Sequence, residues 1–148
     1  MKHRKTLSAL FALAGMAGLA AYAADDAITL TVTVYGATAD KGQAVLTLFT
    51  SRETFLKQPH TTRIVPIGAD GATVIRVSDL EPGIFAVNVY YDEDGNGELN
   101  TNFFGIPTEL VGFSNQAKGL LGPPSFKKAS FALSADHAID IRLGKAKD

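Results

Sequence analysis

"ITLTVTVY", residues 28–35, is the stretch of this chain that indicates its fold most clearly. Its apolar residues Ile28, Leu30, Val32 and Val34 alternate with threonines and a final tyrosine. Successive side chains of a β-strand point to opposite faces, so this alternation predicts a strand with one buried and one exposed face. The first element expected in the folded chain is therefore a half-buried strand.

Six further segments have the composition and length of short β-strands. They cover residues 43–50, 62–67, 72–77, 84–91, 126–133 and 137–143. Pro66 cannot donate a backbone hydrogen bond to a neighbour, which places its strand on a sheet edge. The strand at 84–91 is apolar on both faces, so we expect it at the centre of a sheet. We predict an all-β fold, a seven-stranded antiparallel sandwich of the immunoglobulin-like or prealbumin-like kind.

One interval, residues 92–125, lacks the periodicity of a strand or a helix. Long loops of this kind in a compact domain are either functional or disordered. This one has too many apolar residues for disorder, so we expect one long ordered loop that folds as a lobe over one end of the sandwich. We expect four phenylalanines to form the core of this lobe, rather than to stack on a sugar or grip a peptide: Phe103, Phe104, Phe113 and Phe126.

The first 23 residues have the three-part pattern of an export signal. Three basic residues precede an uncharged apolar run of 15 residues (7–21), and the run ends in Ala-Tyr-Ala, a signal-peptidase site. The apolar run is shorter than the roughly 18 residues of a membrane-spanning helix. We therefore predict a signal peptide at residues 1–23, a single β-sandwich domain at residues 24–148, and a periplasmic or secreted location.

Removal of this segment would leave a mildly acidic domain without cysteine. Three of the 14 Lys and Arg residues and none of the 15 acidic residues lie in residues 1–23, so residues 24–148 carry a net charge of −4. This charge disfavours binding to nucleic acid and to anionic lipid. Without disulfides, the domain must be held together by its core or by a bound ion. We expect a monomer with no membrane span after cleavage and with a protein or glycan ligand at the long loop.

The acidic stretch "YYDEDGNGELNTN", residues 90–102, is similar to the first half of a calcium-binding loop. Asp92, Asp94 and Asn96 occur at alternate positions and a glycine follows, as in an EF-hand. Phe103 stands at the twelfth position, where a bidentate Glu belongs, and a strand rather than a helix precedes the loop. The pattern therefore predicts a calcium site in a β context and excludes an EF-hand.

Further residues of the interval would complete the shell of such an ion. Asn100 occupies the ninth position, the carbonyl of Glu98 the seventh, and Glu109 or Asn102 would supply the remaining oxygen. The candidate metal ligands are Asp92, Asp94, Asn96, Glu98, Asn100 and Glu109. The alternative is a glycine-rich turn with solvated acids, in which Asn and Gly adopt positive φ angles.

No residue stands in a pattern that would identify a catalytic group. Ser114 lacks the second glycine of a nucleophile elbow, and His60 and His137 have no metal-ligand spacing. We therefore predict an exported, non-catalytic binding or envelope-associated module, with calcium as a candidate stabilising ion. The alternative is a periplasmic hydrolase that works in the interval 92–125 with His60 or Ser114.

Two resemblances accompany these predictions. Residues 77–87, "VSDLEPGIFAV", are similar to a turn and strand of prealbumin-like sandwiches. Residues 92–103, followed by the motifs at 105–107, 112–115 and 122–126, resemble a family of small exported bacterial proteins named domain of unknown function twenty-one forty-one. This second resemblance spans most of the chain after the signal and implies a secreted or periplasmic sandwich. It implies no activity.

Overall fold

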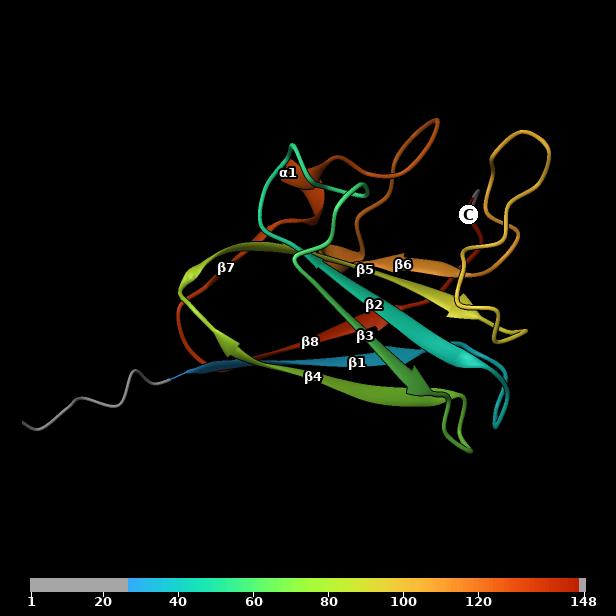
Figure 1. Cartoon of the computed structure of the whole chain (residues 1–148), viewed down its shortest axis with the longest axis horizontal. Coiled ribbons are helices and arrows are strands. Elements are labelled where there is room, and N and C mark those ends of the chain that lie inside the picture. Colours follow the sequence, from blue (N-terminus) through green and yellow to red (C-terminus); the bar gives the residue numbers. More distant parts are fainter. Residues whose placement is uncertain (1–26, 147–148) are drawn as a thin grey trace, which may run out of the picture.

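The computed structural model describes residues 27–146, which form two facing β-sheets (Figure 1). The predicted signal peptide at residues 1–23 lies outside the described residues. The strands are β1 (Ile28–Tyr35), β2 (Gln43–Phe49), β3 (Thr61–Pro66), β4 (Ala72–Leu80), β5 (Gly83–Asp92), β6 (Val111–Phe113), β7 (Phe131–Leu133) and β8 (His137–Arg142). One sheet has the order β4-β1-β8, the other has the order β3-β2-β5-β6, and β7 pairs with the start of β5. The prediction of an all-β fold is confirmed.

The core lies between the two sheets and follows the alternation of the sequence. The apolar face of β1 is at most 4% exposed, and it packs with Leu46 of β2 and Val87 of β5 in one cluster. Each fully buried aliphatic side chain of this kind stabilises the fold by about 1.5–3 kcal/mol. The core therefore accounts for the stability of a domain that has no disulfides.

Two predictions about the second sheet are confirmed. β3, which contains Pro66, lies at the edge of this sheet. An edge strand has no neighbour on one side, so it tolerates a residue without a backbone N–H donor. β5 lies between β2 and β6, and its residues from Phe85 to Val89 are at most 8% exposed. A strand with neighbours on both sides and little exposure needs apolar residues on both faces.

The prediction of seven antiparallel strands is wrong in number and in direction. Residues 27–146 contain eight strands, and β1 pairs with β8 in parallel, in a register that runs from Leu30–His137 to Tyr35–Arg142. A tight hairpin forces antiparallel pairing, whereas strands joined through a long path can pair either way. The whole chain from β2 to β7 separates β1 from β8, so the strand pattern alone does not determine their direction.

The strand that the sequence did not show is β6, which is only three residues long. Alternation cannot be recognised over Val-Gly-Phe, but the structure explains the glycine. A Cβ atom at Gly112 would lie 2.5 Å from Cγ2 of Ile141 and 2.9 Å from the carbonyl oxygen of Arg142. Glycine therefore allows β6 to approach β8 and link the two sheets at this end.

The strand predicted at residues 126–133 is confirmed only for its last three residues, which form β7. A single turn of helix, α1 (Phe126–Ala129), precedes the short β7. Phe126 and Ala129 are three residues apart, as on one face of a helix, and both pack in a second apolar cluster with Phe49 and Phe55. The rings of Phe55 and Phe126 are 5.7 Å apart. Packing against this cluster thus replaces the expected strand by a helical turn.

The interval 92–125 is ordered, but it does not fold as one lobe with its own core. It divides into an acidic loop (residues 93–110), β6, a 3-10 helix η1 (Ser114–Gln116), and a second loop at residues 117–125 that we call the proline loop. Figure 1 shows both loops on the same side of the molecule, next to β5 and β6. Of the residues that the structure describes, none belongs to a helix long and apolar enough to cross a membrane.

The apolar residues of the interval separate into two groups. Phe113 and Phe126 pack against the second cluster, as a core prediction requires. Phe103 and Phe104 contact each other, with ring centroids 5.5 Å apart, but are 96% and 82% exposed at the end of the acidic loop. The expectation that all four phenylalanines form a core is therefore wrong for this pair, because the loop projects from the sheet. The proline loop carries a second exposed pair, Leu120 and Leu121.

Candidate functional site

Asp92, the last residue of β5, organises the acidic loop. Its carboxylate is fully buried and accepts four hydrogen bonds. Oδ1 accepts from the backbone N–H of Gly95 at 2.8 Å and of Asn96 at 3.1 Å; Oδ2 accepts from Gly97 N at 2.8 Å and Gln43 Nε2 at 2.7 Å. Gly95 and Gly97 have φ angles of 73° and 80°, which turn the loop so that consecutive N–H groups point at one anion.

These contacts keep Asp92 ionised although it is buried. Burial raises the pKa of the Asp92 carboxyl, but hydrogen bonds, first from Gln43 and then from Gly97, lower it more, so the net pKa lies below its ordinary value. Burial also raises the pKa of Tyr90, and nearby carboxylates, Asp92 first, raise it further. The Tyr90 hydroxyl donates to the carbonyl oxygen of Gly97 at 3.0 Å, which ties the loop back to β5.

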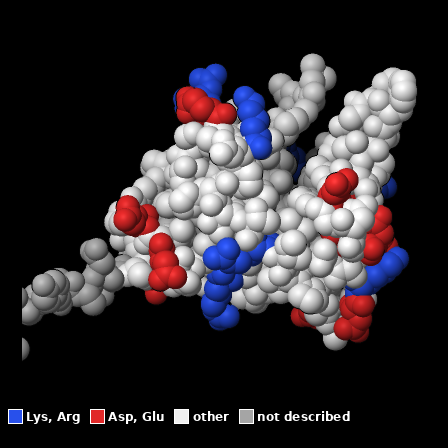
Figure 2. Space-filling model, viewed as in Figure 1, with Lys and Arg blue, Asp and Glu red and all other residues white. Residues whose placement is uncertain are grey.

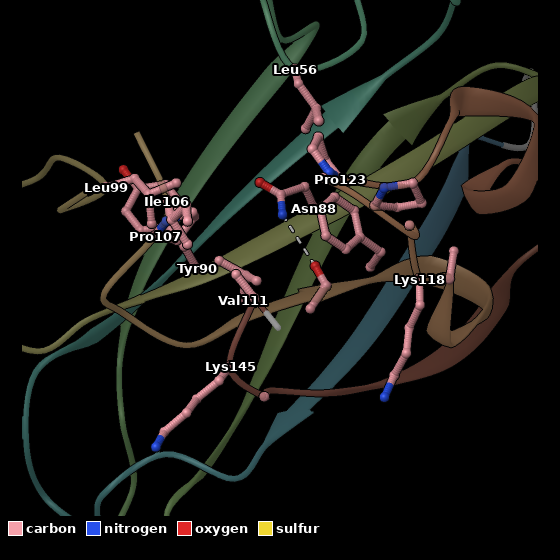
Figure 3. Close-up of a pocket in the computed structure, with 18 of the residues that line it drawn as sticks. Leu56, Asn88, Tyr90, Leu99, Ile106, Pro107, Val111, Lys118, Pro123 and Lys145 are labelled. Atoms are coloured by element: carbon pink, nitrogen blue, oxygen red, sulfur yellow. Dashed lines mark hydrogen bonds between the residues drawn. The ribbon is translucent and has the colours of Figure 1, made fainter. Parts of the chain in front are cut away.

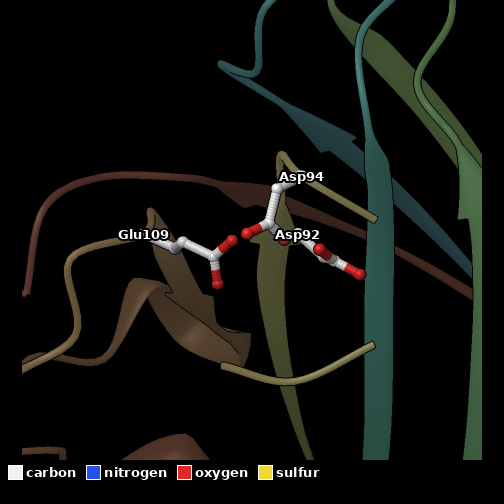
Figure 4. A group of neighbouring side chains, drawn as sticks. All are labelled: Asp92, Asp94 and Glu109. Carbon is white, nitrogen blue, oxygen red and sulfur yellow. The ribbon is translucent and has the colours of Figure 1, made fainter. Parts of the chain in front are cut away.

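Asp94 and Glu109 complete a group of three carboxylates with Asp92 (Figure 4). One oxygen atom from each lies within 4.8 Å of the others. Glu109 also accepts hydrogen bonds from Glu93 N at 3.2 Å and Asn100 N at 3.0 Å, so it joins the two ends of the acidic loop. The structure thus brings together three of the six predicted metal ligands.

The other predicted ligands lie beside this group in different roles. The side-chain amides of Asn96 and Asn100 both donate to Asp94 Oδ2, at 3.2 and 3.0 Å. The carboxylate of Glu98 lies outside the three-carboxylate group, while its N–H donates to Asn96 Oδ1 at 2.8 Å. Asn102 accepts from Phe104 N and Ile106 N, and therefore shapes the end of the loop.

Ser114 is a buried structural residue in this arrangement. Its hydroxyl oxygen is fully buried, accepts from Val87 N at 2.9 Å and donates to the carbonyl oxygen of Ala129 at 2.6 Å. His60 and His137 are both exposed, and neither forms a hydrogen bond with Ser114. Ser114 therefore joins β5 to α1, and the structure does not bring the three candidate catalytic residues together.

A groove of about 1330 Å³ lies between the acidic loop and the proline loop (Figure 3). Asn88 and Tyr90 of β5 and Val111 of β6 form its floor, and Asn88 Nδ2 donates to Gly112 O at 3.2 Å there. Leu99, Ile106 and Pro107 form the wall on the side of the acidic loop, and residues 118–124 form the opposite wall. The groove is therefore mainly apolar and has a fixed polar group in its floor.

The charged residues that line the groove are all basic. They are Lys57, Lys118, Arg142 and Lys145, and the described lining residues include no Asp or Glu. One group of carboxylates lies instead at the base of the acidic loop, whose projecting end carries no charged residue (Figure 2). The molecule thus separates an acidic cluster from a groove with basic residues.

The sequence analysis did not identify this groove, although a signal for its two walls exists. "FFGIP" at residues 103–107 and "LLGPP" at residues 120–124 share one pattern, an apolar pair, a glycine, any residue and a proline. Two turns with exposed apolar pairs are unusual in a single short interval. The repeated pattern predicts two similar loop ends, but not that they face each other.

Comparison with known families identifies the chain. It belongs to the family described as "Uncharacterized protein conserved in bacteria (DUF2141)", whose model matches residues 32–141. The matched range runs from β1 to β8 and includes both loops and most of the residues that line the groove, but not those at 142–146. The resemblance stated from the sequence is confirmed. No curated protein matches the chain.

Proposed function

We propose that this protein is an exported, non-catalytic binding or envelope-associated module, and that its ligand binds in the groove between the two loops. The observation that carries this proposal is the groove itself, since Phe104, Leu120 and Leu121 are at least 82% exposed along it. Concave, mainly apolar surfaces with a few fixed polar groups are typical of ligand sites, and exposed apolar patches mark interaction surfaces.

The absence of catalysis in this proposal is supported by Ser114. Its hydroxyl is buried in two strong hydrogen bonds, and a serine nucleophile must reach a substrate and contact a base. The alternative, a periplasmic hydrolase working in the interval 92–125, would need other groups. We also propose that the sandwich is of the immunoglobulin-like or prealbumin-like kind, on the grounds of its two facing sheets and the resemblance of residues 77–87.

A neutral fluorescent probe tests the groove. Nile red should bind the protein saturably, and Phe104→Ser should weaken binding several-fold because it removes part of the groove lining. Phe103→Ser is the matched control, since Phe103 is also largely exposed but does not line the groove. Equal effects of the two substitutions, or no saturable binding, would contradict the proposal.

Export rests on the pattern of residues 1–23. The intact mass of protein recovered from the periplasm or the medium should correspond to a chain that begins at Ala24. A chain that retains Met1 and stays with the inner membrane would disprove export, and it would leave the groove proposal to its own test.

The second candidate function is weak calcium binding by the acidic loop. The favouring observation is the proximity of the three carboxylates of Asp92, Asp94 and Glu109. Because these groups already accept N–H donors and the twelfth-position Glu is absent, the affinity should be low, on the order of 10⁻⁴ to 10⁻³ M. The alternative remains an acidic turn held together by its own N–H groups.

Melting curves in chelator and in calcium separate these alternatives. Calcium at about one hundred times its dissociation constant would stabilise the protein by about 2.7 kcal/mol, which raises the melting temperature by several degrees. Asp94→Ala should abolish the shift, whereas Glu93→Ala should retain most of it, because Glu93 pairs with Lys41 at the surface. Superimposable curves for the parent protein would favour the acidic turn.

A further inference from the structure

The charge of the groove is opposite to the charge of the domain. Residues 24–148 carry a net charge of −4, yet the four charged residues that line the groove are all basic. Figure 3 shows Lys118 and Lys145 extending from the same side of the groove, with Leu56 on the opposite side. A ligand in this groove would thus have its anionic part on one side and apolar surface next to it.

The groove is large enough to accept more than a small head group. It is bounded by Leu99 and Ile106 from one loop and by Leu120 from the other, over a floor that includes Val111. Its volume of about 1330 Å³ exceeds the roughly 300–1,000 Å³ of ordinary small-molecule pockets. The basic residues alone would suit any anion, but this surface selects one with an extended apolar segment.

We infer that the ligand is an anionic amphiphile, a single acyl chain with one carboxylate or phosphate head group. The inference rests on the proposed groove-binding function and names its ligand class. The acyl chain lies between the two loops, where each buried methylene raises affinity up to about fourfold. The head group lies next to Lys118 and Lys145 at the exposed edge of the groove, where opposite charges attract.

Two features favour a lone amphiphile over a bilayer surface as the bound species. The end of the acidic loop, residues 99–108, contains no Lys or Arg, whereas membrane-docking segments carry basic residues next to their inserted apolar ones. In addition, Glu93, Asp94 and Glu98 stand at the base of the acidic loop, where they would approach an anionic leaflet. Lys118 and Lys145 extend outward from one side of the groove (Figure 3), and they therefore suit the head group of a molecule whose chain enters it.

Three surfactants with the same chain length and different head groups test this inference. Dodecanoate, dodecyl maltoside and dodecyltrimethylammonium would each be titrated, below their micelle concentrations, into ¹⁵N-labelled protein. Dodecanoate should shift the amide signals of Val111, Gly112 and Lys118 and bind at least about tenfold more tightly than the neutral surfactant. The cationic surfactant should bind most weakly.

Variants then assign the charge preference to named residues. Lys118→Gln combined with Lys145→Gln should weaken dodecanoate binding about tenfold and leave dodecyl maltoside binding unchanged. Lys127→Gln is the matched control, because Lys127 is an exposed lysine of α1 that does not line the groove. It should leave both affinities unchanged.

The outcomes separate this inference from the groove proposal. If the neutral surfactant shifts the same signals and binds as tightly as dodecanoate, the anionic ligand class is overturned and the groove function stands. If no surfactant shifts the groove signals, the inference is overturned, and Nile red binding decides the groove function independently. If vesicles of anionic phospholipid bind the protein while dodecanoate does not, bilayer docking replaces the inference.

Discussion

The two loops that border the groove end in the same sequence pattern but are held in different ways. The acidic loop is anchored by three hydrogen bonds to Asp92, which connect it to β5, and by two to Glu109, which close its base. Among residues 27–146, the segment 118–124 takes part in one hydrogen bond, from Lys128 Nζ to Lys118 O at 3.4 Å. Its Gly, Pro and Leu residues offer no side-chain acceptor. We conclude that the groove has one fixed wall and one adaptable wall.

Removal of the Asp92 carboxylate should cause the largest loss of stability, because it removes the anchor of the fixed wall. Asp92→Ala leaves several donors of the acidic loop without their acceptor, and we expect a loss of about 3 kcal/mol in the free energy of unfolding. Glu93→Ala, which removes only a surface ion pair with Lys41, should cost less than about 1 kcal/mol. Urea unfolding measures both values. Similar losses would show that Asp92 does not anchor the loop.

Acid should release the acidic loop through the same carboxylate. The folded-state pKa of Asp92 is lowered, so its contribution to stability is fully present above the ordinary Asp pKa of about 3.9 and is lost as the pH falls through the folded-state value. The free energy of unfolding, measured by urea between neutral pH and pH 3, should therefore fall at the acidic end. Asp92→Asn should flatten this dependence, and an unchanged slope in that variant would count against the assignment.

Substitution of one glycine in each loop tests how strongly the backbone of that loop is constrained. Gly97 has a φ of 80°, so Gly97→Ala should destabilise the protein by about 1 kcal/mol through backbone strain. Gly122 has no positive φ and nothing within 4 Å of its added Cβ, so Gly122→Ala should be neutral or stabilise by up to about 1 kcal/mol. Thermal melting gives both differences, and equal losses would mean that the proline loop is as constrained as the acidic loop.

The smallest effect on stability is expected at the end of the proline loop. Leu120 and Leu121 are 96% and 104% exposed, so replacing both by Ser should change the free energy of unfolding by less than about 0.5 kcal/mol. The same double variant should weaken dodecanoate binding, because Leu120 and Leu121 line the groove. A large loss of stability would show that the leucines pack inside the fold instead.

The parts of the fold that depend on local chemistry could be predicted from the sequence. The alternation of β1 gives its buried face, and Pro66 gives the edge position of β3. The direction of the β1–β8 pair could not be predicted, because it depends on how the whole intervening chain crosses between sheets. β6 could not be predicted because three residues are too few to show a period. The requirement for glycine at position 112 becomes clear only from its close approach to Ile141 in the folded chain.

The acidic loop and the groove also differ in how far they could be predicted from the sequence. The residues around Asp92 are close in sequence, so their spacing predicted a compact acidic loop. It did not predict that backbone N–H groups would donate hydrogen bonds to the Asp92 carboxylate. The basic residues that line the groove come from three separate segments, and only the folded chain places them around it: Lys57, Lys118, and the pair Arg142 and Lys145. A net charge calculated from composition therefore disfavours anionic lipid, while the local charge favours an anionic amphiphile.

Amide hydrogen exchange with and without dodecanoate tests the central claim most directly, because it reports both walls of the groove in one experiment. In the free protein, the amides of Gly95 and Gly97 should exchange slowly and those of residues 118–122 should exchange fast. Dodecanoate should slow exchange at residues 118–122 and leave Gly95 and Gly97 unchanged. Equal exchange in the two loops of the free protein, or no change at residues 118–122 at saturating dodecanoate, would contradict the account of a groove with one fixed and one adaptable wall.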